Sequence, residues 1–203
     1  MAYFPMMIDL EGTDVMVVGA GKEADKKVEV LAQFGPYITL IAPMAEPKIL
    51  PLVKEYICRE FADGDITGSE KKYAMVVAAT DDRKVNERIS RLAGERHIPV
   101  NIVDDTELCS FIFPAIHKDK DVVCAVSSGG KGPVITQYIR DRLREVLPEN
   151  IGEINERMGE LRLTAKRKFP ELAQRRQYLQ MCLEQMLAGD ETEEKDNDSQ
   201  TKR

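Results

Sequence analysis

A glycine-rich turn near the N-terminus has the spacing of a dinucleotide-binding site. In the stretch VMVVGAGKEADKK, Gly19 and Gly21 are followed by Ala24 in the pattern GxGxxA. The first glycine suits a tight turn, the second lets backbone approach a pyrophosphate, and a small third residue lets a helix pack closely on a strand. A glycine turn without a ligand is the alternative, but the strand pattern before the turn and the helical pattern after it favour binding.

Two groups of acidic residues follow later apolar runs. Asp81 and Asp82 come after one run, and Asp104 and Asp105 come after another. A carboxylate at the carboxyl end of a strand, beside a nicotinamide, could act as a general acid or base, or it could cap the next element. The helical pattern that follows favours capping for Asp81 and Asp82. For Asp104 and Asp105 the two interpretations are equally supported.

The acidic residue that usually holds the adenosine ribose, about 20 residues after the glycines, is absent. The second apolar run ends in Pro43 and Met44, and the first carboxylate after it is Glu46. No arginine stands there to bind a 2′-phosphate. The residues alone therefore leave the choice between NAD and NADP open.

Other residues that often carry chemistry are sparse. The segment from Ser127 to Gly130 could hold an anion through its amides or merely turn the chain. His97, expected at the surface, and His117, expected in a hairpin turn, have no partner at metal-ligand spacing, so no metal site is predicted. The four cysteines form no CxxC pair, and we expect free thiols, with Cys109 and Cys124 buried.

The elements that must position these residues alternate between strands and helices. Strand patterns are VMVVGAG, YITLIAP, ICREF, KKYAMVVAATD and HIPVNIVDD, with helical patterns in GKEADKKVEVLAQFG and from Asp82 to Glu95. Such alternation predicts an α/β fold with a parallel sheet, whose binding crevice lies at the carboxyl ends of the strands.

The pattern changes after residue 113. SFIFPAIHKDKDVVCAVSSGG predicts two strands joined at HKDKD, GPVITQYIRDRLREVLP predicts an amphipathic helix, and a helical region from about Asn150 to Leu187 is broken near Phe169 and Pro170. We predict a nucleotide-binding domain over 1–113, a connecting unit over 114–148, a helical domain over 149–188 and a disordered acidic tail over 189–203.

Composition narrows the class of protein. The chain has 203 residues and a net charge of −6, and it contains neither a membrane-spanning apolar run nor a signal-peptide pattern. We expect a cytoplasmic protein without a nucleic-acid or membrane partner. The segment from Arg162 to Arg176 holds six bases against one acid. A solvated helix face is favoured there over a surface that binds a polyanion.

The order of six motifs resembles that of the precorrin-2 dehydrogenase family, some members of which are also sirohydrochlorin ferrochelatases. The motifs are YFPMMIDLEG, VVGAGKEADKK, VVAATDD, VNIVDD, SFIFPAI and AVSSGGKGP. The likeness spans Tyr3 to about Arg144 and continues weakly to about Tyr178. It implies a Rossmann-type NAD-binding domain, a small α+β dimerisation unit and a helical C-terminal domain, with two chains intertwined as a homodimer.

The resemblance also implies an activity and a set of residues. The activity is NAD-dependent dehydrogenation of precorrin-2, a tetrapyrrole with acetate and propionate groups, to sirohydrochlorin in siroheme biosynthesis, with insertion of ferrous iron as a further activity to test. Asp104 is the implied acid or base, and Asp105 is the fallback. With such a substrate, the basic segment from Arg162 to Arg176 is as well explained by binding of substrate carboxylates as by a solvated helix face. The expected cofactor-binding residues are Gly19, Gly21, Lys22, Glu23, Ala24, Pro43, Met44, Thr80 and Asp81, and the expected substrate-binding residues are Ser127, Ser128, Gly129, Gly130 and Lys131.

Two departures from the family pattern bear on these expectations. Glu23 stands where the family has an apolar residue, and a carboxylate there would weaken pyrophosphate binding unless it points away. Gly132 replaces a serine, while Lys131 adds a cation. Glu23 thus leaves open a chelatase that has lost the redox step. A non-catalytic module that senses NAD or NADH is a second alternative, since regulatory Rossmann domains bind these cofactors without chemistry.

Overall fold

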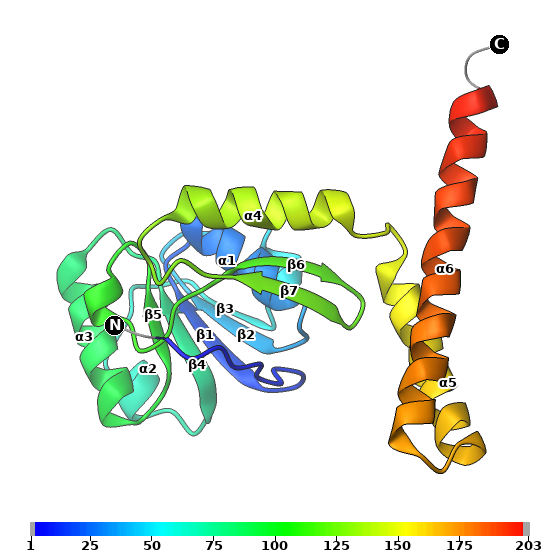
Figure 1. Ribbon diagram of the computed structural model, residues 1–203. Helices are drawn as coiled ribbons and strands as arrows, with labels where there is room; N and C mark the ends of the chain where they lie inside the picture. Colours follow the sequence, from blue (N-terminus) through cyan, green and yellow to red (C-terminus); the bar gives the residue numbers. More distant parts are fainter. Residues whose placement is uncertain (1–2, 201–203) are drawn as a thin grey trace. The chain divides into compact units, whose positions relative to one another are not determined.

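The computed structural model describes residues 3–200, with side chains described up to residue 189. The chain separates into two compact units (Figure 1). The first runs to Phe113 and includes Gly129–Lys131, and the second comprises Pro114–Ser128 and the chain from Gly132 onward. The domain limits at residues 113, 148 and 188 stay a prediction.

A five-stranded parallel sheet forms the centre of the first unit, and the predicted α/β fold class is confirmed. The sheet order is β3-β2-β1-β4-β5. The strands are β1 (Asp14–Val18), β2 (Tyr37–Ile41), β3 (Glu55–Ile57), β4 (Tyr73–Ala78) and β5 (Val100–Ile102). Because β1 is central and all pairs are parallel, the carboxyl ends of β1, β4 and β5 meet at one edge.

The predicted position of the third strand is wrong. The strand β3 ends at Ile57, so most of ICREF lies outside the sheet. Beyond Ile57 the backbone turns, because the Arg59 amide donates to the Ile57 carbonyl at 2.9 Å. The Arg59 guanidinium then pairs with the Asp65 carboxylate, which draws this segment toward the helix α2 (Gly64–Thr67).

Helices cover both faces of the sheet, as the alternation of side chains on β1 requires. Val15 and Val17 pack in one core with residues of α1 (Lys22–Ala32), whereas Met16 and Val18 pack in the other with residues of α3 (Arg83–Glu95). Two short 3-10 helices, η1 (Leu50–Leu52) and η2 (Thr106–Leu108), complete the unit. The sheet edge that carries the candidate site is thus held by a core on each side.

The second unit combines a hairpin with three helices. The strands β6 (Ala115–Asp119) and β7 (Val122–Val126) pair antiparallel, and α4 (Pro133–Val146), α5 (Ile151–Lys168) and α6 (Leu172–Gln200) follow. The predicted break near Pro170 is confirmed. The helix α6 extends through residues 189–200, for which the sequence predicts a disordered tail, and residues 201–203 lie outside the described part.

The predicted position of His117 in the hairpin turn is wrong. His117 lies in β6 opposite Cys124, not in the turn. The turn needs only Lys120 and Asp121, because Lys120 adopts a left-handed conformation with φ of 47°. At the end of β6, the Asp119 carboxylate accepts a 2.6 Å hydrogen bond from the Gly152 amide and so joins the hairpin to α5.

All four cysteines are free thiols, as expected. Cys109 and Cys124, however, are only partly buried. The Cys109 thiol lies between β5 and η2, where the Ile102 amide donates to it at 3.1 Å, and burial raises its pKa. Cys124 lies on a two-stranded hairpin, which is too small to bury both of its faces.

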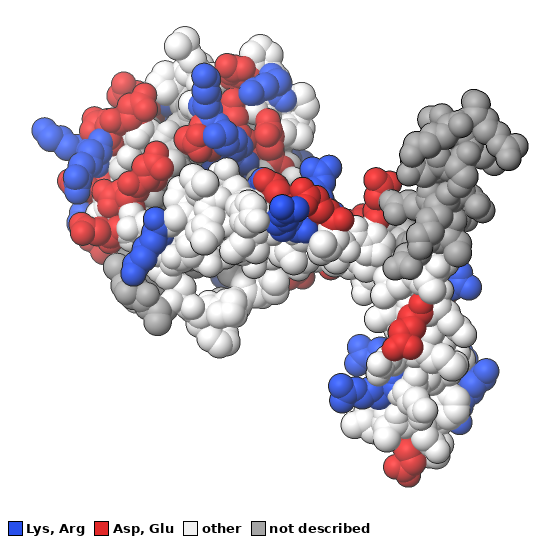
Figure 2. Space-filling model, turned by 45° about the horizontal axis from the view of Figure 1, so that its top comes forward, with Lys and Arg blue, Asp and Glu red and all other residues white. Residues whose placement is uncertain are grey.

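The basic segment lies on the helices of the second unit, where Figure 2 shows several Lys and Arg side chains. Arg175 donates to the carbonyls of Phe169 and Pro170, both at 2.7 Å, and so stabilises the turn between α5 and α6. Lys166, Arg167 and Lys168 are exposed in the last turn of α5, where cations also favour the helix dipole. Binding of substrate carboxylates by this segment stays a prediction.

No helix among residues 3–200 combines the length and the apolar character that crossing a membrane requires.

Candidate functional site

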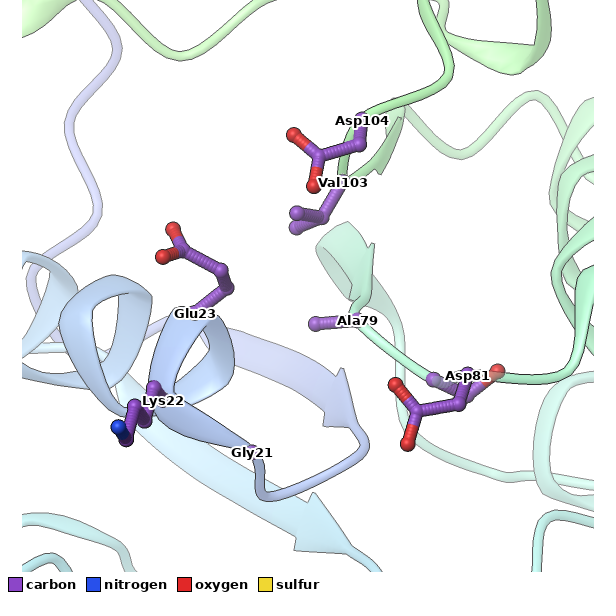
Figure 3. Close-up of a pocket in the computed structure, with 8 residues that line it drawn as sticks. Gly21, Lys22, Glu23, Ala79, Asp81, Val103 and Asp104 are labelled. Carbon is purple, nitrogen blue, oxygen red and sulfur yellow. The ribbon is translucent and has the colours of Figure 1, made fainter.

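A pocket of about 410 Å³ opens at the carboxyl ends of β1, β4 and β5 (Figure 3). Its volume is within the range of small-molecule sites. Eight residues line it: Gly21, Lys22, Glu23, Ala79, Thr80, Asp81, Val103 and Asp104. Six of these were predicted as site residues from the sequence, and the fold brings them together from three separate segments.

The glycine turn packs against the segment after β4 that lines this pocket. Gly19 has a φ of 97°, and a side chain on it would meet the Ala79 carbonyl oxygen at 2.3 Å. The turn is therefore packed directly on the chain that leaves β4. Ala24 is fully buried against the sheet, so it supports the turn without lining the pocket.

The N-terminus of α1 fits a bound pyrophosphate. Gly21 is the N-cap, and a side chain built on it would meet nothing within 4 Å. No side chain of the described residues caps the helix, so amides of the first turn stay available to an anion, which the helix dipole also favours. The residues present therefore fit a dinucleotide cofactor.

Glu23 is the acid that departs from the family pattern in this turn. It lines the pocket, but a neighbouring cation partly compensates its negative charge. Its carboxylate pairs with the Lys26 ammonium at 2.5 Å, one turn along α1. In Figure 3 its carboxylate lies on the side away from Gly21, whereas the Lys22 side chain extends away from the pocket centre. The negative charge thus lies away from the N-cap at Gly21.

The two acids after β4 have different roles. Asp82 is the N-cap of α3 and accepts hydrogen bonds from the amides of Lys84 and Val85, as expected. Asp81 caps nothing and lines the pocket, so the capping interpretation is wrong for it. The preceding Thr80 is held in place by Asn86, whose amide donates to the Thr80 carbonyl at 2.9 Å and whose Oδ1 accepts from the Thr80 hydroxyl at 2.8 Å.

The two acids after β5 divide in the same way. Asp105 is the N-cap of η2, accepting from the Glu107 amide at 3.3 Å, and it lies 3.5 Å from the Arg83 guanidinium. Asp104 lines the pocket with a left-handed backbone and φ of 61°. Left-handed residues other than glycine are uncommon and concentrate at functional sites.

Pro43 and Met44 follow β2 and do not line this pocket. The Met44 side chain is 83 % exposed, and the Cys58 thiol donates to the Pro43 carbonyl at 3.2 Å. Because β2 neighbours β1, both residues lie at the same edge of the sheet as the glycine turn. Their contact with an adenosine ribose stays a prediction.

Lys48 joins the loop after β2 to α1, a feature that the sequence analysis missed. Its ammonium lies 3.2 Å from the Asp25 carboxylate and 3.8 Å from that of Glu46. Asp25 is 3 % exposed, and its second oxygen has no hydrogen-bond partner among the described residues. The hydrogen bond with Asp25 raises the pKa of Lys48, which keeps this cation charged.

The predicted substrate-binding segment is divided between the two units. In the first unit, Gly130 packs on η2, because a side chain on it would lie 2.8 Å from Thr106 Cγ2. In the second unit, the Ser128 hydroxyl bonds to the amide and the carbonyl of Gly132, at 2.9 and 3.1 Å. Ser127, Gly129 and Lys131 are the other members. Substrate binding by this segment stays a prediction.

Groups of three or more acidic, histidine or cysteine residues that could hold a metal ion are absent from the described residues.

Known proteins resemble this chain in sequence and in fold. A protein-family model described as NAD(P)-binding matches residues 6–115. The siroheme synthase of Azotobacter vinelandii is 37 % identical over 202 residues, which is 95 % of this chain and 43 % of that protein. The siroheme synthase of Nitrosospira multiformis is 36 % identical over 192 residues, or 91 % of this chain and 40 % of that protein.

Among solved structures, SirC, a precorrin-2 dehydrogenase, has a TM-score of 0.68 at 20 % identity and covers 94 % of this chain and all of its own. At this identity the likeness concerns the fold. The chain spans about two fifths of the length of the curated relatives it matches. These findings confirm the resemblance drawn from the six motifs.

Proposed function

The chain belongs to the NAD(P)-binding family that matches residues 6–115, and from this we propose that it is an NAD-dependent precorrin-2 dehydrogenase of siroheme biosynthesis. The observation that carries the proposal is the position of Asp104. Its carboxylate lines the same pocket as the uncapped N-terminus of α1, which fits a dinucleotide pyrophosphate. The similarity to siroheme synthases supports the choice of substrate.

Oxidation of precorrin-2 to sirohydrochlorin removes a hydride and a proton. When bound, NAD supplies the hydride acceptor. The amides of Gly21 and Lys22 would hold its pyrophosphate, at the sheet edge where β4 and β5 also end. The Asp104 carboxylate accepts the proton at one of its oxygens. Its left-handed backbone sets the direction of the side chain into the pocket.

An anaerobic incubation of the protein with precorrin-2 and NAD tests this function. We expect NADH and sirohydrochlorin to appear in equal amounts, followed by absorbance. NAD binding by calorimetry without either product would favour the NAD-sensing module instead. Failure to bind NAD, together with iron insertion into added sirohydrochlorin, would favour the chelatase that lacks the redox step.

NAD is expected to bind at least about tenfold more tightly than NADP, a difference of about 1.4 kcal/mol. Lys48 is engaged by Asp25 and Glu46, and the Glu46 carboxylate would repel a 2′-phosphate. Calorimetry with both cofactors measures the ratio, and Glu46→Gln is expected to reduce it. Equal affinity of the unmodified protein for NAD and NADP would contradict the prediction.

The second unit supports the proposal that the protein is a homodimer. Four large residues on α4 are strongly exposed in a single chain: Val134, Ile135, Tyr138 and Val146, with exposed fractions of 78, 54, 59 and 75 %. Exposed apolar surface of this kind is typical of an interface. A second copy would cover it.

A further inference from the structure

We propose that Lys27 is a substrate-binding residue, whose ammonium anchors one carboxylate of the tetrapyrrole beside Asp104. This inference rests on the proposed function and deepens it. Lys27 follows Lys26 directly, and no local sequence pattern distinguishes the surroundings of the two side chains.

Lys27 does not itself line the pocket, but it lies one helical turn beyond Glu23, which does. It lies four residues after Glu23, so the two side chains share one face of the helix. Helical side chains lean toward the helix N-terminus, which here is the pocket end. The Lys27 ammonium lies 4.4 Å from the centroid of the Phe113 ring. This cation–π contact holds the ammonium in a defined place.

Lys27 has unused hydrogen-bonding capacity. Its ammonium makes neither a hydrogen bond nor an ion pair with any described side chain, and its one specific contact among them is the ring of Phe113. Lys26 and Lys48, by contrast, are paired with Glu23 and Asp25. Three ammonium donors of Lys27 are therefore free to bind an anion.

Burial makes the charged form of Lys27 unfavourable as long as no anion is bound next to it. Burial lowers the pKa of Lys27, and the charge of Lys26 acts in the same direction. The charges of Glu23 and Asp104 act in the opposite direction and raise it. A partly desolvated cation kept without a paired anion is typical of a binding site, where the ligand supplies the missing charge.

The substrate has the complementary chemistry. Precorrin-2 carries acetate and propionate carboxylates, whereas the pocket lining holds three acids, Glu23, Asp81 and Asp104, and one cation, Lys22, whose side chain extends away from the pocket centre (Figure 3). A cation is needed to bring a carboxylate of the substrate next to Asp104. A charge-assisted hydrogen bond from Lys27 meets that need and would orient the macrocycle toward the proton acceptor.

The test compares Lys27→Met with Lys27→Arg and with Lys84→Met, which removes an equal charge from an exposed site on α3. In Lys27→Met we expect the KM for precorrin-2 and the dissociation constant for sirohydrochlorin to rise about 10- to 100-fold, the loss of a charged hydrogen bond. Lys27→Arg should recover most of the affinity, and Lys84→Met should change it by less than about twofold. NAD affinity should stay within about twofold in all three.

Thermal unfolding without ligands separates binding from a structural role. Because its burial is unfavourable, replacing Lys27 with methionine should not lower the melting temperature. Equal losses of NAD and tetrapyrrole affinity would overturn the inference and assign Lys27 to the pyrophosphate, and an unchanged tetrapyrrole affinity would overturn it as well. If the protein binds sirohydrochlorin through Lys27 but forms no NADH, the role of Lys27 stands and the dehydrogenase function is refuted. If it binds no tetrapyrrole at all, the role of Lys27 and the dehydrogenase function are both refuted.

Discussion

Asp104→Asn is expected to lower kcat for precorrin-2 oxidation by about 10²- to 10⁴-fold, the usual contribution of a general acid or base. Asparagine has nearly the same size, and it tolerates the left-handed conformation that Asp104 adopts. The backbone and the pocket should therefore persist, while the proton acceptor is lost. The NAD dissociation constant, measured by calorimetry, should stay within about twofold.

Asp105→Asn is the matched control. Asp105 is the N-cap of η2, and asparagine caps as well as aspartate does, so the variant should keep most of its activity. A large loss in Asp105→Asn together with full activity in Asp104→Asn would transfer the catalytic role to Asp105. A loss of NAD affinity in Asp104→Asn equal to the loss in turnover would instead assign Asp104 to cofactor binding.

Gly19→Ala is expected to lower the free energy of unfolding by about 3 kcal/mol or more and to abolish NAD binding. The added methyl group would meet the Ala79 carbonyl oxygen at 2.3 Å, and backbone at that position cannot move without separating β1 from β4. The φ of 97° adds strain for any residue with a side chain. Denaturant unfolding and NAD calorimetry measure the two effects.

Gly21→Ala distinguishes the turn from the ligand site. The methyl group would meet no atom within 4 Å, and the backbone at Gly21 is extended, so unfolding should change by less than about 1 kcal/mol. The same methyl group would occupy space expected for the pyrophosphate, and NAD affinity should fall at least about tenfold. Unchanged NAD affinity in Gly21→Ala would show that the cofactor does not approach this residue.

The sequence determined the fold class and the location of the candidate site. Apolar runs alternating with helical patterns fix a parallel sheet, because both strand and helix periodicity are local properties. The glycine spacing at Gly19 and Gly21 and the acids after the strands then place the site at the carboxyl edge. The third strand was misplaced because ICREF is short, and its pairing depends on the turn held by Arg59 and Asp65.

Only the tertiary structure decided the positions of neighbouring acids and lysines. Asp104 and Asp105 are adjacent and chemically alike, and they differ because the left-handed backbone turns one into the pocket and leaves the other to cap η2. Lys26 and Lys27 differ in the same way, since only Lys27 meets the ring of Phe113, which is distant in sequence. Backbone direction and contacts between distant segments arise on folding, so no local pattern could have revealed them.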